Sequence, residues 1–522
     1  MSITVFVPCD AIALALGADD VAEQIVAGAA ARSIDVQVVR NGSRGLFWLE
    51  PLVEVATDQG RHAYGPVSPD DVDSLFTAGF TAGPCDHPLA LGPVDEIAEL
   101  AGQTRLTFAR HGVVDPRSLA DYLAHGGYDG LRTALAEGPE HVVAQVTASG
   151  LRGRGGAAFP TGIKWQTVAG APALPKYVVA NADEGDSGTF SDRMVMEGDP
   201  FCLLEGMTIA AVGVGATHGV VYIRSEYPQA IATVQAAIDS ARSAGWLGAD
   251  IAGSGHAFDV EIRVGAGAYI CGEETSMLES IEGKRGMVRP KPPLPALEGL
   301  YGKPTVVNNV VTLASVPWIL ANGGAAYAAH GVGRSAGTLP VQLAGNVARG
   351  QLVEVPFGIT LRELVHGYGG GTRSGRPVGA VQIGGPLGAY FADAQLDTVL
   401  DYEAISAAGG LLGHGGVVVF DDTVDLIAQA RFAMSFCAVE SCGKCTPCRV
   451  GSTRGVELID RIASGHQADR TRRQLDELCE VLEAGSLCAL GGLTPYPVRS
   501  ALQLWDQQRD EASATAPNGE GH

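Results

Sequence analysis

The chain is poor in positive charge. Its 522 residues include 36 lysines and arginines against 58 aspartates and glutamates, which gives a net charge of −22 and a sequence pI of about 4.9. A field of this sign repels nucleic-acid backbones and anionic lipids, so we expect neither nucleic acid nor a membrane as a partner. A phosphate-bearing ligand has to be held locally, by backbone amides and a few basic side chains.

Long uncharged apolar runs are also missing. No such run reaches the ~18 residues of a membrane span, and residues 1–10 lack the basic segment that opens a signal peptide. The ten cysteines, four of them grouped as candidate ligands, fit a reducing compartment better than a disulfide framework. The sequence therefore predicts a cytoplasmic protein, and its length predicts about three or four domains.

Cysteines form the strongest local pattern that is present. Three of them recur at two-residue intervals in residues 441–449, and a fourth lies far downstream. This spacing lets a backbone wrap three corners of a [4Fe–4S] cluster while a distant cysteine closes the fourth corner. Lys444, Arg449 and Arg454 add positive charge that favours thiolate. Taken alone, the cysteines also fit a structural zinc site. The candidate ligands are Cys442, Cys445, Cys448 and Cys488.

The first part of the chain reads as a small α/β unit. Apolar runs predict strands at residues 3–7, 36–39 and 52–55, and a helix at 21–31. This order predicts a thioredoxin-like domain over residues 1–83. Cys9 is the only cysteine in that span, so the domain is predicted to be degenerate and without a cluster.

Residues 84–125 read as a connector that ends in a helix near 118–124. Residues 126–330 alternate apolar strands, such as 177–180 and 220–223, with helical stretches, which indicates an α/β domain.

A compact unit follows over residues 335–415. Its order is a hairpin (339–343 with 351–355), a helix that the capping box Thr360–Glu363 opens and that runs to Tyr368, and a strand at 378–383. This is the order of a ubiquitin-like β-grasp domain of the SLBB-like kind.

Residues 420–508 read as a helical domain, with Asp422 as the N-cap of its first helix and glycine stops at Gly465 and Gly485. Cys437 and Cys479 recur on apolar helix faces and are predicted to be structural. Residues 509–522 are polar and are predicted to form a disordered tail.

A glycine-rich run over residues 150–165 is the second motif. Its glycines, with Arg152, Arg154 and Lys164, can present backbone amides and positive charge to phosphates, and Phe159 and Trp165 offer flat surfaces for a ring. The run is neither a Walker A loop nor a G-x-G-x-x-G fingerprint, and by itself it is also compatible with an ordinary loop.

Three polar blocks complete the set. Residues 181–186 follow a predicted strand, where open α/β sheets bind ligands. Residues 265–275 place a glycine before paired carboxylates at a predicted helix start, and residues 304–309 end in two asparagines. Each block alone is compatible with a turn or a cap.

Together and in this order, the five blocks resemble the flavin-bearing, NADH-reactive subunit of respiratory complex I. Its soluble relatives are the diaphorase subunits of NAD-reducing hydrogenases and the beta subunits of NAD-dependent molybdenum- or tungsten-containing formate dehydrogenases. The resemblance covers about residues 126–505. It implies FMN and NAD(H) on a Rossmann-like domain, then a β-grasp domain, then a helical bundle with one [4Fe–4S] cluster. FMN joins hydride transfer to one-electron transfer.

The resemblance also implies roles for single residues. It places Phe159 near the NAD adenine, Asn308 and Asn309 around the FMN phosphate, and the Glu184 carboxylate near the nicotinamide in a positioning or electrostatic role. The chain departs from the family at Thr167, Leu294 and Asp186, and the family often has glutamate at the last position. The implied FMN and NAD contacts are Gly153, Arg154, Gly155, Gly156, Phe159, Lys164, Asn181, Asp183, Glu184, Tyr269, Gly272, Glu273, Glu274, Asn308 and Asn309, and the implied cluster ligands are the four cysteines above.

The degenerate first domain is most similar to formate dehydrogenase beta subunits. The resemblance thus implies the diaphorase subunit of a cytoplasmic NAD-dependent formate dehydrogenase. Its implied partners are a small thioredoxin-like [2Fe–2S] subunit and a large molybdenum- or tungsten-containing, formate-oxidising subunit with iron–sulfur clusters. A hydrogenase diaphorase is the alternative, followed by a complex I subunit. A zinc-stapled scaffold or a β-grasp recruiting module would leave the glycine and asparagine blocks unexplained.

Overall fold

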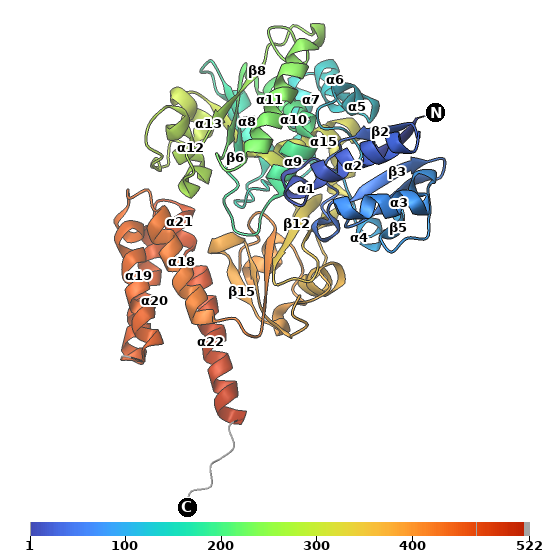
Figure 1. Cartoon of the computed structure of the whole chain (residues 1–522). Coiled ribbons are helices and arrows are strands. Elements are labelled where there is room, and N and C mark those ends of the chain that lie inside the picture. The colour runs from blue at the N-terminus through green and yellow to red at the C-terminus, as the bar shows by residue number, and fades with distance from the viewer. Residues whose placement is uncertain (1, 466, 516–522) are drawn as a thin grey trace, which may run out of the picture.

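Sheets and helices follow one another along the chain as a mixed α/β, multidomain arrangement that ends in a bundle of helices (Figure 1). The computed structural model describes residues 2–465 and 467–515. Every helix in these ranges is too short or too polar to cross a lipid bilayer.

The first sheet has five strands in the order β2-β1-β3-β4-β5. β1 lies parallel to β2 and antiparallel to β3, and the predicted strands and helix are all present. The sheet continues past residue 83, because β5 pairs with β4 inside the span predicted to be a connector. The elements are β1 (Ile3–Phe6), α1 (Ala11–Ala15), α2 (Ala18–Ala31), β2 (Val36–Val39), β3 (Val53–Thr57), β4 (Gly60–Tyr64), α3 (Val72–Ala78) and β5 (Ala90–Pro93).

The connector carries two short helices, α4 (Ala98–Ala101) and α5 (Leu119–Ala124). The predicted helix near residue 118 is confirmed, and the side chain of Ser118 caps it by accepting from the amide of Asp121. Several contacts hold the first sheet to the next unit. The amide of Ala11 donates to Glu197, and a side chain at Gly42 would collide with Gly198.

The second sheet has four parallel strands in the order β8-β7-β6-β9. Helix α10 is buried along its whole length, which fits its mostly apolar sequence. All four strands end at the same edge of the sheet. The strands are β6 (Tyr177–Ala182), β7 (His218–Ile223), β8 (Asp259–Val264) and β9 (Thr305–Asn309).

Helices surround this parallel sheet in Figure 1. They are α6 (Asp129–Glu137), α7 (Pro139–Ala148), α8 (Thr161–Gly170), α9 (Ser191–Gly198), α10 (Pro200–Val214), α11 (Pro228–Ser243), α12 (Glu274–Ile281), α13 (Pro295–Glu298), α14 (Val310–Ala314), α15 (Val316–Asn322) and α16 (Gly324–Ala328).

The third sheet has the order β13-β12-β16-β14-β15 and lies below the parallel sheet and beside the helical bundle in Figure 1. The predicted hairpin is confirmed as β12 with β13, and the capping box at Thr360 and Glu363 is formed. The middle strand β16 lies beyond the predicted limit of residue 415. The elements are β10 (Gly331–Val332), β11 (Ser335–Ala336), β12 (Thr338–Gly345), β13 (Gln351–Pro356), β14 (Val378–Ile383), β15 (Ala389–Phe391), α17 (Tyr402–Ala407) and β16 (Gly416–Asp421).

The bundle corrects two predictions. Asp425, not Asp422, caps the first helix by accepting from the amide of Ala428, because the helix begins at Leu426; Asp422 pairs with Arg376. The last helix runs past residue 509, where the tail was predicted to begin; its Ala-rich sequence supports helix. The rest of that predicted tail, 516–522, lies outside the described residues. The helices are α18 (Leu426–Glu440), α19 (Ser452–Ala463), α20 (Ala468–Gly485), α21 (Ala489–Leu493) and α22 (Pro495–Thr515).

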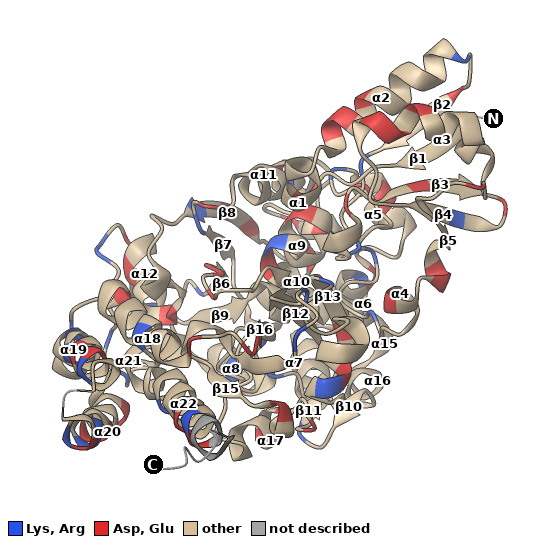
Figure 2. Ribbon diagram, turned by 60° about the horizontal axis from the view of Figure 1, so that its bottom comes forward, with Lys and Arg blue, Asp and Glu red and all other residues tan. Residues whose placement is uncertain are grey.

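Charge is spread unevenly over these units. Acidic side chains gather on α2, while α19, α20 and α22 carry both signs (Figure 2). The interior of the parallel sheet carries mainly apolar residues, so the few charges buried near its strand ends stand out.

Candidate active site and cysteine cluster

The predicted polar residues meet at the carboxyl edge of the parallel sheet. β6 and β9 are neighbours in register, so Asn181 lies opposite Asn309. The side chain of Asn181 donates to the carbonyl of Gly272, and its oxygen accepts from the amide of Asp183. Blocks that are far apart in sequence therefore form one continuous edge.

The two asparagines at the end of β9 are held rigidly. Asn308 accepts a hydrogen bond at 2.9 Å from the ring nitrogen of Trp165. Asn309 caps α14 through its oxygen and donates from Nδ2 to both carboxylate oxygens of Asp192, at 2.7 and 2.8 Å. Trp165 is fully buried in this role, so it offers no open surface to a ring, contrary to one reading of the sequence.

The glycine-rich run packs directly on this edge. A Cβ at Gly155 would lie 2.8 Å from the Cβ of Asn309, and Gly156 has a positive φ of 106° beside Gly413. The amide of Gly153 closes the loop by donating to the carbonyl of Phe159, whose side chain is exposed. The close backbone approach at Gly155 and Gly156 forms a cradle that larger residues would fill.

Arg154 is placed differently from the sequence expectation of a phosphate contact. Its side chain is 1% exposed, and the guanidinium donates to the carbonyls of Ala336 and Thr338 and to the hydroxyl of Tyr327. The guanidinium also lies over the ring of Phe357. Its charge ties the glycine-rich run to the third sheet instead of facing a ligand.

Lys164 and the paired glutamates form a charged rim. Lys164 donates to the carbonyl of Val307 and lies 3.5 Å from Glu274, while Lys291 contacts both Glu273 and Glu274. Glu273 caps α12. Burial would raise the pKa of Glu274, but the two lysines hold it below its ordinary value.

Asp183 has an unused acceptor. Its Oδ2 is buried and has no hydrogen-bond partner among the described residues. Burial raises the pKa of Asp183 to about 7. A buried polar atom without a partner is costly, so this oxygen fits a hydrogen-bond donor on a ligand such as a flavin ring.

The two neighbouring carboxylates differ in orientation. Glu184 is buried and accepts from the amides of Asp192 and Arg193 in the first turn of α9, and from the hydroxyl of Tyr227. Asp186 is only partly buried and accepts from the hydroxyl of Tyr269 at 2.7 Å. The structure therefore turns the Glu184 carboxylate toward the interior. Asp186 instead lies beside Tyr269, a pairing that the sequence analysis did not predict.

His414 is a buried site residue that the sequence did not reveal. It comes from the loop before β16, yet its ring lies 3.3 Å from Asp192 and 3.9 Å from Glu184. The only signal was a histidine among glycines, a pattern typical of an ordinary turn.

The four predicted ligand cysteines share one apolar cluster at the start of the bundle. Cys442 and Cys448 are buried, and Cys445 and Cys488 are partly exposed. All ten cysteines are free thiols. Cys437 and Cys479 are fully buried as predicted, but Cys437 also lies next to the group, with its sulfur 3.7 Å from that of Cys448. Four free thiols from two segments suit an iron–sulfur cluster.

One short turn joins the two parts of the site. The 3-10 turn η6 (Tyr269–Gly272) receives the side chain of Asn181 at one end. At the other end the amide of Tyr269 donates to Glu440, and its ring packs edge-on against Phe436 of α18. The nucleotide-side edge and the cysteine bundle are thus in direct contact.

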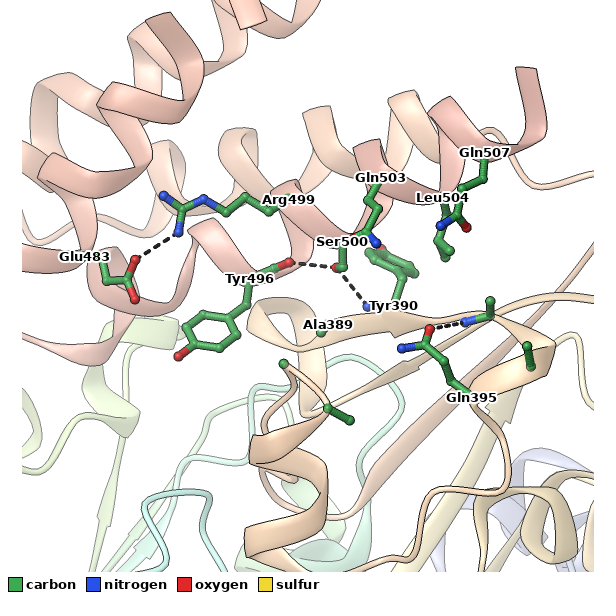
Figure 3. Close-up of a pocket in the computed structure, with 14 residues that line it drawn as sticks. Ala389, Tyr390, Gln395, Glu483, Tyr496, Arg499, Ser500, Gln503, Leu504 and Gln507 are labelled. Carbon is green, nitrogen blue, oxygen red and sulfur yellow. Dashed lines mark hydrogen bonds and ion pairs between the residues drawn. The ribbon is translucent and has the colours of Figure 1, made fainter. Parts of the chain in front are cut away.

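A separate pocket lies away from these groups. It has a volume of about 430 Å³ between α22 and the third sheet, and none of the predicted site residues lines it. Figure 3 shows Tyr496, Arg499 and Ser500 on one wall and Tyr390 on the other, with Ser500 bonded to the backbone of Tyr390. This pocket is a groove between two units, and it is separate from the predicted cofactor residues.

Comparison with known proteins covers most of the chain. Residues 146–318 match the Nuo51 FMN-binding domain, and residues 428–512 match the NADH-ubiquinone oxidoreductase-F iron–sulfur binding region. The NADP-reducing hydrogenase subunit HndC of Solidesulfovibrio fructosivorans is 47% identical over 403 residues, which are 77% of this chain and 82% of that protein. An NADH-quinone oxidoreductase subunit of Rhizobium meliloti (strain 1021) is 47% identical over 392 residues, which are 75% of this chain and 93% of that protein.

A solved structure extends the similarity. In the NAD+-reducing [NiFe]-hydrogenase in its H2-reduced state, a chain superimposes with a TM-score of 0.69 at 30% identity, covering 99% of this chain and 85% of that one.

Proposed function

The chain belongs to the family of flavin-bearing, NADH-reactive subunits that these matches define, as its five sequence blocks predicted, and we propose that it is the diaphorase subunit of an NAD-dependent formate dehydrogenase. At the family level it is an NADH-dehydrogenase-type oxidoreductase whose cofactors are FMN, NAD(H) and one [4Fe–4S] cluster. Its relatives are subunits of larger complexes. We propose that it works in the cytoplasm.

One observation carries the diaphorase function: η6 touches both the polar sheet edge and the cysteine bundle. Bound FMN supplies the exchange between two-electron hydride chemistry and one-electron transfer to iron and sulfur. This arrangement needs no protein nucleophile. The residues bind, orient and exclude water.

Individual side chains receive roles on this basis. The backbone of Gly153, Gly155 and Gly156 and the amides of Asn308 and Asn309 form the FMN cradle. Asn181, Asp183, Tyr269 and Gly272 line the ring side, and Lys164, Glu273 and Glu274 form the rim, with Phe159 free to stack on an adenine. Glu184 does not contact the nicotinamide; it acts on that side by holding the first turn of α9. Asp186 is the carboxylate closer to Tyr269. Cys442, Cys445, Cys448 and Cys488 bind the cluster.

We assign the units accordingly. Residues 1–83, with β5, form a degenerate thioredoxin-like domain, and the FMN and NAD domain is Rossmann-like over 126–330. A β-grasp domain over 335–415, completed by β16, precedes the helical cluster domain that begins near residue 420. The structure adds Cys85 to the core of the first unit. Cys9 and Cys85 are too few to hold a cluster, and this supports the formate dehydrogenase assignment.

The first experiment records the absorption spectrum of the anaerobically purified chain before and after NADH. Flavin bands and a broad iron–sulfur shoulder that both bleach would establish the relay. A colourless, zinc-containing protein that FMN, iron and sulfide fail to reconstitute would contradict it.

The hydrogenase diaphorase is a second candidate, because a chain of an NAD+-reducing [NiFe]-hydrogenase superimposes on nearly the whole of this chain. Isolation of the native complex through a tag on this chain separates the two candidates. Molybdenum or tungsten, formate-dependent NAD+ reduction and a small [2Fe–2S] subunit are expected for the formate dehydrogenase. Nickel and hydrogen-dependent reduction would identify a hydrogenase.

A further inference from the structure

His414 lies where the third sheet meets the start of α9. Its side chain is 6% exposed. Its Nε2 lies 3.3 Å from Asp192 Oδ1 and 3.2 Å from the hydroxyl of Ser191, and its Nδ1 lies 3.9 Å from Glu184 Oε1. None of the family roles described above involves this histidine. It is nevertheless the residue that joins these buried carboxylates to the third sheet.

The loop that carries His414 is held in place through its backbone, by bonds that do not involve the histidine ring. Gln342 of β12 donates to the carbonyl of His414 and accepts from the amides of Phe190 and Ser191. One glutamine thus fastens the loop to the first turn of α9. A change in the ring of His414 leaves this attachment in place, so its effect can be separated from loss of the fold.

The carboxylates that face His414 are fully committed to the site. Asp192 accepts from Asn309 on both oxygens, and Glu184 accepts from the amides of Asp192 and Arg193. Two buried carboxylates repel one another unless a cation balances them. A charged imidazole supplies such a cation here, and the three side chains are also close enough to hold a metal ion.

The same network underlies the flavin cradle. Asn309, which Asp192 holds, packs against Gly155. Gly413, next to His414, packs against Gly156, with 3.7 Å to the position of an added Cβ. His414 is therefore separated from each of these two glycines by a single residue: from Gly155 by Asn309, whose Nδ2 lies 3.4 Å from His414 Nε2, and from Gly156 by Gly413.

The ionisation of this group is consistent with a counter-charge. Burial lowers the pKa of His414, but Asp192, Glu184 and Asp186 more than offset this and raise it to about 9. Burial and Asp192 raise the pKa of Glu184 to about 7, and His414 acts against this rise. The imidazole is therefore charged at neutral pH.

We propose that His414 is a positioning residue of the flavin site: its positive charge balances Asp192 and Glu184, so that Asp192 holds the amide of Asn309 where the cradle needs it. The proposal rests on the role given above to Asn309. Its pH dependence has a definite sign. Since the pKa of His414 is raised from 6.5 to about 9, the positive charge that faces Asp192 is complete below about pH 6.5 and is lost as the pH rises through about 9.

The test follows release of FMN from the holoprotein by the rise in free-flavin fluorescence, between pH 6.5 and 9.5. The wild-type chain should hold FMN more weakly as the pH rises toward 9. In His414→Gln the affinity at pH 7 should fall about tenfold, and the alkaline loss should disappear. His366→Gln alters an exposed histidine of the same unit and should match the wild type.

A double variant separates charge balance from packing. Asp192→Asn with His414→Gln removes both charges and keeps an acceptor for Asn309, so it should bind FMN more tightly than His414→Gln alone. An unchanged thermal midpoint reports that the variants have folded. Wild-type affinity and pH profile in His414→Gln, or a double variant weaker than the single one, would overturn the proposal. FMN release requires neither formate nor a partner subunit, so failure of the formate assignment leaves the result readable.

Discussion

The nucleotide side and the cysteine side of the site are built on different principles. Side chains on the nucleotide side come from the parallel-sheet unit and the third sheet. Buried charged side chains, such as Asp192 and His414, join these two units. On the cysteine side three of the four predicted ligands lie in one short run, and the four cysteines share one apolar cluster. The geometry of the nucleotide side depends on how the units pack against one another. The cysteine side depends mainly on residues that are close together in the sequence.

This difference predicts where remote substitutions matter. On the nucleotide side a residue that touches no cofactor, such as Arg154, can still displace the cradle, because it holds two units together. On the cysteine side only the thiols themselves should be indispensable. Four substitutions test this contrast, the first three beside a matched control variant and the fourth at two salt concentrations.

The largest effect should come from Cys445→Ser. A hydroxyl is a poor ligand for iron beside three thiolates, so the variant should lose its cluster while it keeps FMN. Iron and sulfide analysis and the spectrum of the NADH-reduced protein measure this. Cys479→Ser changes a buried thiol of α20 in the same bundle and should retain the cluster. A full iron complement in Cys445→Ser would remove this residue from the ligand set.

Gly155→Ala should break the nucleotide side. The added methyl would lie 2.8 Å from Asn309 Cβ, and overpacking of this kind costs about 1–3 kcal/mol. FMN should bind at least about tenfold more weakly, whereas the iron content should stay unchanged. Gly170→Ala adds a methyl to α8 where no atom lies within 4 Å, and it should bind FMN normally. Equal FMN affinity in the two variants would argue against the cradle.

Arg154→Met tests the docking of the two sheets. It leaves Tyr327 and two carbonyls without their donor, which should lower the free energy of unfolding by about 2–4 kcal/mol. The thermal midpoint of the parallel-sheet unit should fall accordingly. Arg334→Met alters a side chain that is 78% exposed and should leave the midpoint nearly unchanged. If the two variants melt alike, the buried guanidinium is not the tie between the sheets.

The smallest effect should come from Glu403→Gln. Arg152 and Glu403 form an ion pair at 2.7 Å between the glycine-rich run and α17, but Glu403 is half exposed. Solvent screens such pairs, so the loss should be about 0.5 kcal/mol or less. A midpoint measured at low and high salt should show the effect only at low salt. A loss as large as that of Arg154→Met would mean that the rim, and not the interior, holds the units together.

Local patterns explain which features the sequence could predict. The cysteine spacing, the capping box at Thr360 and the strand before Asn181 depend on neighbouring residues, and each is present as expected. The family resemblance is confirmed by the matches to both regions.

Tertiary contacts explain what the sequence could not predict. Arg154 is buried because it donates to carbonyls of β11 and β12, which lie far from it in the sequence. His414 reaches Asp192 only because the third sheet, to which its loop belongs, packs against α9. The inward turn of Glu184 follows from the placement of α9. Asp422 and Asp425 are equally good cap residues by type, and Asp425 is the one that directly precedes the helix start at Leu426. Strand β16 adds to the third sheet by pairing with β12, about seventy residues earlier.

The pairing of β6 with β9 also sets the order in which parts of the site can form during synthesis. During synthesis, β6 has no neighbour on one side until residues 305–309 emerge, because everything between them belongs to the crossovers and to β7 and β8. The cradle then lacks Asp192's counter-charge until residue 414 has been made. Such distant pairings form slowly. Flavin should therefore load only after most of the chain has left the ribosome, and the cluster, whose last predicted ligand is Cys488, should load later still.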